Sequence, residues 1–175
     1  ECVTIPMADG GEGTTKARGA SRGGGRDQTV VQDPCGKAKR AVYGMLPGRV
    51  GVAESAEACG LSLAKPGLDP EATTTFGVGE LVAACLDDGC KTVMIGLGGT
   101  ATNDCGCGAA AALGAVFRDG EGRSFVPVGG TMHALRSVDL SALRKKLAGI
   151  RLVGMCDVMA PLCGPMGAAL VYSLQ

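Results

Sequence analysis

Apolar residues recur at two spacings along the middle of the chain, and each spacing predicts a different element. Between positions 78 and 86 they fall at i, i+3, i+4, i+7 and i+8, one face of a helix that Gly89 would end. Residues 91–97 form a nearly continuous apolar run, typical of a strand buried on both faces of a parallel sheet. The alanine-rich residues 105–113 predict a second helix, closed by Gly114. This alternation indicates an α/β domain.

Further elements are predicted on both sides of this region. A helix is expected at 141–148 and another buried strand at 150–155. The turn at Pro47 and Gly48 marks a boundary between the regular part and the N-terminal region. Short strands are also predicted at 1–7, 29–32, 41–45 and 115–117, with a loop at 8–14 and turns at 33–36 and 119–122.

Composition and charge narrow the class of protein. The chain has 175 residues, of which 46% are hydrophobic, so it can bury the core of one sizeable domain. Its formal net charge is zero, so no overall basic field attracts nucleic acid. No apolar stretch approaches the ~20 residues needed to cross a bilayer. We therefore predict neither a nucleic-acid partner nor a membrane one.

The cysteines argue against a zinc site. The chain has nine cysteines, no Cys-x-x-Cys pair and a single histidine, His133, whereas zinc needs closely spaced thiolates and imidazoles. Several cysteines stand where small apolar residues would serve. We interpret them as reduced core residues of a cytoplasmic protein.

The run VMIGLGGTATND at 93–104 ends a strand pattern on glycines, hydroxyls and an acid. Glycines at a strand-to-helix turn suit a phosphate, because a helix N-terminus offers free N–H groups, and Thr100 and Thr102 add donors. Asp104 at its end has two interpretations: it holds a magnesium ion, or it caps the following helix. From local sequence alone, capping is the better supported of the two.

A dinucleotide site is an alternative for the same loop. Residues 96–101 match the degenerate Gly-x-Gly-x-x-Ala fingerprint, with Asp119 about twenty residues on as a ribose acceptor. In such a glycine-rich chain, a turn with incidental spacing explains the match more simply. No Walker A string occurs in the sequence.

Three acids follow predicted elements in a similar way. Asp9, Asp104 and Asp157 each stand at the carboxyl end of a predicted strand, the edge at which open parallel sheets bind ligands. Spread acids without an activated serine favour metal-assisted phosphoryl transfer over acyl transfer. The pattern therefore predicts one acidic, glycine-lined site.

Several strings, in order along the chain, resemble the bacterial-type (class I) glycerate kinase family. The two most specific are PMADGGEGT at 6–14 and IGLGGTATNDCGCG at 95–108. DPEATTTFGVGEL at 69–81, CDVMAPLCGPMGA at 156–168 and the lesser string AESAEACGL at 53–61 fit as well.

The resemblance implies a kinase that transfers the γ-phosphoryl group of ATP, with Mg²⁺, to a hydroxyl of D-glycerate. It implies a two-domain α/β fold in which an α/β domain is inserted into a flavodoxin-like one. Residues 1–45 would be a partial segment of the split flavodoxin-like domain, and 46–175 most of the inserted domain. The active site would lie in the cleft between the domains. The identity of the phosphorylated hydroxyl and the oligomeric state, including a homo-oligomer, stay open.

The resemblance also implies roles for individual residues. Asp104, Asp157 and Asp9 are the catalytic candidates, and Asp104 and Asp157 are the candidate Mg²⁺ ligands. Changing Asp104 to alanine is expected to abolish turnover in the complete enzyme while leaving it folded. The residues expected to contact substrate or phosphate are Gly10, Gly11, Glu12, Thr14, Gly98, Gly99, Thr100, Thr102 and Asn103.

The chain departs from the family pattern at several places. Ala160 replaces an asparagine and Cys105 a glycine. The family's Asp-Ser-Phe-Lys segment and its later Gly-Glu-Gly region would lie beyond Glu1 and Gln175, so we expect an incomplete fragment that is inactive alone. Two other classes stay open: an NAD(P)-dependent oxidoreductase domain built on residues 96–101, and a non-catalytic α/β remnant.

Overall fold

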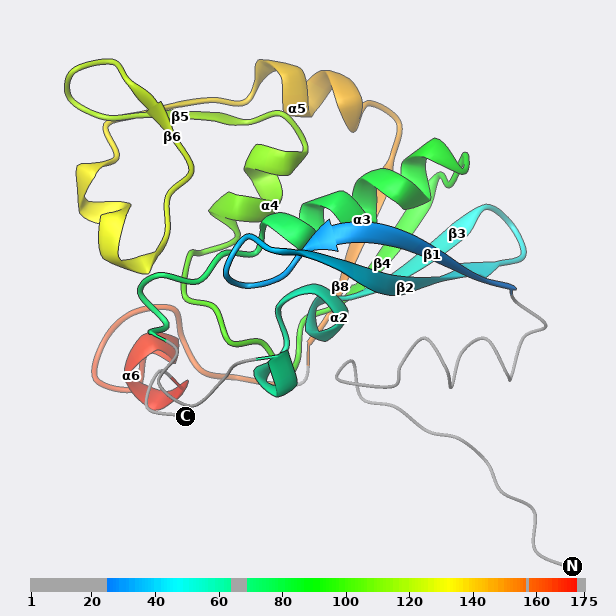
Figure 1. Ribbon diagram of the computed structural model, residues 1–175, viewed down its shortest axis with the longest axis horizontal. Coiled ribbons are helices and arrows are strands. Elements are labelled where there is room, and N and C mark those ends of the chain that lie inside the picture. The colour runs from blue at the N-terminus through cyan, green and yellow to red at the C-terminus, as the bar shows by residue number, and fades with distance from the viewer. Residues whose placement is uncertain (1–24, 64–68, 157, 173–175) are drawn as a thin grey trace, which may run out of the picture.

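The computed structural model describes residues 25–63, 69–156 and 158–172 (Figure 1). The strand predicted at 1–7 and the acidic glycine loop at 8–14 lie outside these ranges. Asp157 lies outside them as well.

A mixed five-stranded sheet forms the centre of the molecule. Its order is β1-β2-β3-β4-β8, with antiparallel pairing from β1 to β3 and parallel pairing of β3 with β4 and of β4 with β8. The α/β fold class is confirmed. The strands are β1 (Gly25–Gln32), β2 (Ala38–Leu46), β3 (Val50–Glu54), β4 (Thr92–Gly96) and β8 (Arg151–Met155).

The sheet runs without a break across the position where a domain boundary is predicted. The turn at Pro47 and Gly48 joins β2 to β3, and Leu46 pairs with Val50 immediately across it. Residues 25–45 therefore share one sheet with the residues that follow. The assignment of residues 1–45 to a flavodoxin-like domain and of 46–175 to an inserted one stays a prediction.

Helix α3 (Phe76–Asp87) lies along one face of the sheet and buries the core (Figure 1). Its apolar stripe matches the predicted period: Leu81 and Cys85 are fully buried and pack in one cluster with Val93 of β4. The described residues also form the helices α2 (Ser55–Cys59), α4 (Cys107–Ala112), α5 (Ser141–Lys146) and α6 (Ala168–Tyr172), with 3-10 turns η1 (Leu61–Leu63) and η2 (Gly129–Ala134).

A smaller three-stranded sheet, ordered β6-β5-β7, stands apart from the main one (Figure 1). It consists of β5 (Val116–Arg118), β6 (Ser124–Phe125) and β7 (Ser137–Asp139), all antiparallel. The turn at 119–122, predicted from its aspartate and glycines, connects β5 to β6. In the part of the chain that is described, no helix has both the length and the apolar character to span a bilayer.

One predicted strand is correct in position but wrong in burial. Residues 151–155 of this run form β8, yet Arg151 is exposed and Leu152 is 40% exposed. The reason is that β8 is the last strand of the described sheet and pairs only with β4 there. An apolar run therefore predicted the element, but not its place in the sheet.

Candidate functional site

The loop at 98–104 connects the end of β4 to the start of α4, as predicted. β4 ends at Gly96, which pairs with Glu54 at the end of β3 and with Met155 at the end of β8. Since β3, β4 and β8 are parallel, the loop lies at the edge formed by their carboxyl ends. This is the edge at which open α/β sheets place ligands.

The end of α2 and the residues that follow it hold the loop on one side. The Ala101 N–H donates to the Cys59 carbonyl at 2.8 Å, and the Leu61 N–H donates to the Gly99 carbonyl at 2.9 Å. Between these bonds Thr100 forms an isolated antiparallel bridge with Gly60. The loop backbone is therefore fixed by pairing rather than free in solution.

The segment before α3 holds the loop on the other side. The Thr73 hydroxyl donates to the Ala101 carbonyl at 2.7 Å, and Thr73 is 1% exposed. Two residues later, Thr75 donates hydrogen bonds to the carboxylate of Asp104, the last residue of the loop. Sequence reasoning missed both threonines, although a run of hydroxyls before a helical pattern is a capping signal.

Asp104 is buried, at 1% exposure, and its carboxylate is surrounded by donors. Its Oδ2 accepts hydrogen bonds from the Thr75 N–H at 2.8 Å, the Thr75 hydroxyl at 2.8 Å and the Gly108 N–H at 3.1 Å. Its Oδ1 accepts one from the Gly106 N–H at 3.0 Å. A carboxylate offers about four lone-pair sites, so four donors leave little for a metal.

This geometry favours the capping interpretation of Asp104, and its assignment as a Mg²⁺ ligand stays a prediction. A bound magnesium ion usually keeps several of its waters, whereas this carboxylate is buried and surrounded by protein donors. Among the residues that the structure describes, no three histidine, cysteine or acidic side chains gather as a metal site. The catalytic role of Asp104 stays a prediction, and it would have to act through the loop that this residue fixes.

The other described residues predicted to bind substrate line the loop itself. Gly99 and Asn103 are exposed, while Gly98, Thr100 and Thr102 are partly exposed. Gly99 adopts φ 69°, which only glycine reaches without strain. The loop is thus at least partly exposed at these five residues, whereas Asp104 is buried.

The thiol of Cys59 lies behind the loop. Its Sγ donates to the Ser55 carbonyl at 3.3 Å and lies 3.9 Å from the Thr102 hydroxyl. Burial raises the pKa of this thiol to about 12. Cys59 is therefore a neutral packing group at physiological pH rather than a nucleophile.

The structure does not test whether the predicted acids converge. Asp9 and Asp157 lie outside the described residues, as do Gly10, Gly11, Glu12 and Thr14. Glu54, which sequence reasoning did not single out, is a buried acid at the carboxyl end of β3. Glu54 is a single acid at the end of an apolar segment, so no spacing between acidic residues marked it as a candidate.

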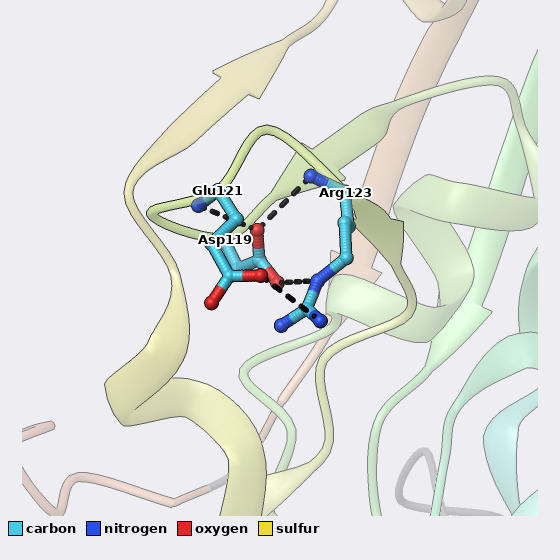
Figure 2. Close-up of polar contacts among 3 residues, drawn as sticks. All are labelled: Asp119, Glu121 and Arg123. Carbon is cyan, nitrogen blue, oxygen red and sulfur yellow. Dashed lines mark hydrogen bonds and ion pairs between the residues drawn. The ribbon is translucent and has the colours of Figure 1, made fainter.

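The acid proposed for a ribose in the dinucleotide alternative is engaged in its own turn. Figure 2 shows the Asp119 carboxylate accepting from Nε of Arg123 at 2.9 Å and from the Glu121 N–H at 2.9 Å. The Arg123 guanidinium, by this hydrogen bond, lowers the pKa of the Asp119 carboxyl. Asp119 therefore organises the turn between β5 and β6, which weakens the case for that alternative.

Comparison with known proteins gives a consistent result. A family model described as the glycerate kinase family matches residues 1–175. A glycerate kinase of Bacillus subtilis strain 168 is 43% identical over 173 residues, which cover 98% of this chain and 45% of that protein. A glycerate 2-kinase of Escherichia coli K12 is 38% identical over 175 residues, covering 99% of this chain and 46% of that protein.

A solved structure agrees with these sequence matches. The crystal structure of a candidate glycerate kinase 2 from Salmonella typhimurium LT2 superposes with a TM-score of 0.91 at 39% identity, covering 97% of this chain. The match covers 46% of that structure. The chain thus spans somewhat less than half the length of the relatives it matches.

Proposed function

Because this chain belongs to the glycerate kinase family, we propose that it forms part of an enzyme that phosphorylates D-glycerate. The reaction moves the γ-phosphoryl group of ATP to a hydroxyl of glycerate and releases ADP and a phosphoglycerate. The relatives are named as glycerate kinases. We propose the same activity for the enzyme to which the present chain belongs.

One observation carries the proposal. The loop at 98–104 is fixed on both sides and lies at the carboxyl edge of the parallel strands β3, β4 and β8. Phosphoryl transfer depends mainly on positioning and on stabilising charge, so a rigid donor-lined loop suits it.

We assign the outer side of this loop to anionic oxygens. The backbone N–H groups of Gly98 and Gly99, the hydroxyls of Thr100 and Thr102 and the amide of Asn103 would donate hydrogen bonds to a phosphate or to the glycerate carboxylate. Such preorganised donors stabilise charge without rearranging during the reaction. The roles predicted from the sequence stay unchanged for the residues of the N-terminal loop outside the described ranges: Asp9, Gly10, Gly11, Glu12 and Thr14.

Mg²⁺ would neutralise phosphate charge, as it does in phosphoryl-transfer enzymes generally. The buried and fully hydrogen-bonded Asp104 is disfavoured as its ligand. Asp157 remains a predicted ligand. We therefore assign no step to the metal.

The remaining assignments follow from the same proposal. D-glycerate and ATP are the small-molecule partners, and the cytoplasm is the proposed location. Eight cysteines of the described part are free thiols, which accords with a reducing compartment. A homo-oligomer remains open.

The proposal is tested by coupling ADP release to a spectrophotometric signal. The protein encoded by the reading frame that contains this sequence is given ATP, Mg²⁺ and D-glycerate. Lactate, which lacks the 3-hydroxyl of glycerate, replaces it in a control. ADP release that requires D-glycerate supports the proposal. Thermal protection by NADH but not by ATP would favour the oxidoreductase alternative, and ligand binding without turnover the remnant.

A further inference from the structure

The N-termini of two helices meet at one buried carboxylate. Thr75 is the N-cap residue of α3, and α4 begins at Cys107. Each helix start leaves backbone N–H groups without a partner in its own helix. Asp104 accepts from Thr75 at the first helix and from Gly106 and Gly108 at the second.

The two helix starts approach each other too closely for a side chain between them. A Cβ on Gly108 would lie 2.2 Å from the Thr74 hydroxyl oxygen, 2.6 Å from the Phe76 nitrogen and 2.8 Å from Asp104 Oδ2. The Asp104 carboxylate thus lies against the donors of both helix starts. The donors that face inward are satisfied within the protein.

Thr75 completes the connection between the helices. Its hydroxyl donates to Asp104 Oδ2 and accepts a hydrogen bond from the Ala109 N–H at 3.0 Å. One side chain at the start of α3 therefore contacts both the end of the loop and the first turn of α4. Thr73, two residues earlier, holds the loop at Ala101.

We propose that Asp104 and Thr75 are positioning residues for phosphoryl transfer: together they hold the loop at 98–103 in its donor-presenting conformation and bind neither metal nor phosphate. The inference rests on the proposed function for its link to catalysis. Loss of either side chain weakens the connection between the C-terminal end of the loop and α3. A loop displaced in this way misplaces every donor that it carries.

The experiment compares five variants of the complete protein. Thr75→Val and Asp104→Asn each remove part of the connection with little change in shape, and the double variant removes both. Thr75→Ser keeps the hydroxyl. Thr74→Val is the matched control, because the Thr74 hydroxyl accepts from the Phe76 N–H at 3.2 Å at the same helix start. The hydrogen bonds to Asp104 come instead from Thr75, Gly106 and Gly108.

We expect kcat to fall by roughly 10- to 100-fold in Thr75→Val and in Asp104→Asn, as misplaced catalytic groups do. The double variant should be about as slow as the slower single variant, since the two residues act as one unit. The Mg²⁺ concentration for half-maximal rate should stay unchanged. Thr75→Ser should recover most of the rate, and Thr74→Val should retain it.

Hydrogen exchange of the peptide carrying residues 98–103 supplies a readout that does not need activity. It should accelerate in Thr75→Val and Asp104→Asn but not in Thr74→Val. A raised Mg²⁺ requirement confined to the Asp104 variant would overturn the inference in favour of a metal ligand. Unchanged loop exchange in both variants would overturn it as well. Absence of ADP from the unmodified protein would count against the proposed function, and exchange would still decide whether the pair fixes the loop.

Discussion

At the scale of single residues, the difference between the sequence and the structure is clearest at Asp104. The sequence placed this acid correctly at the end of a glycine loop, where both a metal ligand and a helix cap are chemically reasonable. Two of its donors come from Thr75, 29 positions upstream. Local sequence predicts the cap of the following helix but not a partner brought in by tertiary packing.

Cys105 has a backbone conformation that is unfavourable for a residue with a side chain. It adopts φ 52°, in the left-handed region that costs a side-chain-bearing residue roughly 1 kcal/mol. The sequence comparison with the family pattern had already marked this position as a glycine replaced by cysteine.

We therefore predict that Cys105→Gly raises the free energy of unfolding by about 0.5–1 kcal/mol, because relief of strain exceeds the added chain entropy. Urea denaturation measures the change. The control is Cys35→Gly, at an exposed position without a positive φ, which should be neutral or destabilising. A destabilised Cys105→Gly variant would contradict the assigned backbone conformation.

At the scale of elements, the long periodic patterns were enough to predict a helix and a strand from the sequence, whereas two short elements could not be predicted. The stripe from 78 to 86 predicted α3, and the apolar run at 91–97 predicted β4. Both are long enough for the spacing of their apolar residues to indicate the type of element. The sequence analysis assigned no strand at β3 and no helix at α2. These five-residue elements exist because neighbours pair with them and cover them.

The contact between α3 and α4 depends on glycine at two points. A Cβ on Gly79 would lie 2.3 Å from the Ala109 carbonyl oxygen, and one on Gly108 would meet the start of α3. Both glycines are buried and have backbone close by, so the helices themselves would have to move apart.

Gly108→Ala should lower the free energy of unfolding by about 1–3 kcal/mol, the usual cost of overpacking a core. Gly120→Ala is the matched control, since a Cβ there finds nothing nearer than 3.9 Å. The melting temperature of each variant measures the effect. Equal melting temperatures for Gly108→Ala and Gly120→Ala would show that the helices do not approach this closely.

At the scale of the whole molecule, the sequence predicted the α/β class but not the continuity of the sheet. The turn at Pro47 and Gly48 resembles a boundary because a proline and a glycine interrupt two apolar segments. In the structure it is the hairpin turn between β2 and β3, which pair directly. Composition at a turn cannot distinguish a hairpin from a linker; strand pairing does.

The buried thiols make the free energy of unfolding depend on pH in the alkaline range. Burial raises the pKa of both Cys59 and Cys85 from 9.0 to about 12. Since the folded-state pKa is the higher one, the contribution to stability is complete below pH 9 and is lost as the pH rises toward 12.

We expect the free energy of unfolding to fall by about 1 kcal/mol per buried thiol between pH 9 and pH 10. Urea denaturation under reducing conditions measures it, and Cys59→Ala should fall less steeply over this interval than the unmodified protein. Cys105→Ala, at an exposed position, should leave the slope unchanged. A Cys59→Ala variant with the original slope would mean that this thiol ionises as easily folded as unfolded.

The central claim is that this chain carries part of a site that transfers phosphate to D-glycerate. Phosphorus NMR of the protein from the complete reading frame, with ATP, Mg²⁺ and D-glycerate, tests it most directly, because it separates transfer from hydrolysis. The account predicts a new phosphomonoester signal that grows in step with ADP and is absent without D-glycerate. ADP accompanied only by inorganic phosphate, or no ADP from the folded protein, would contradict it.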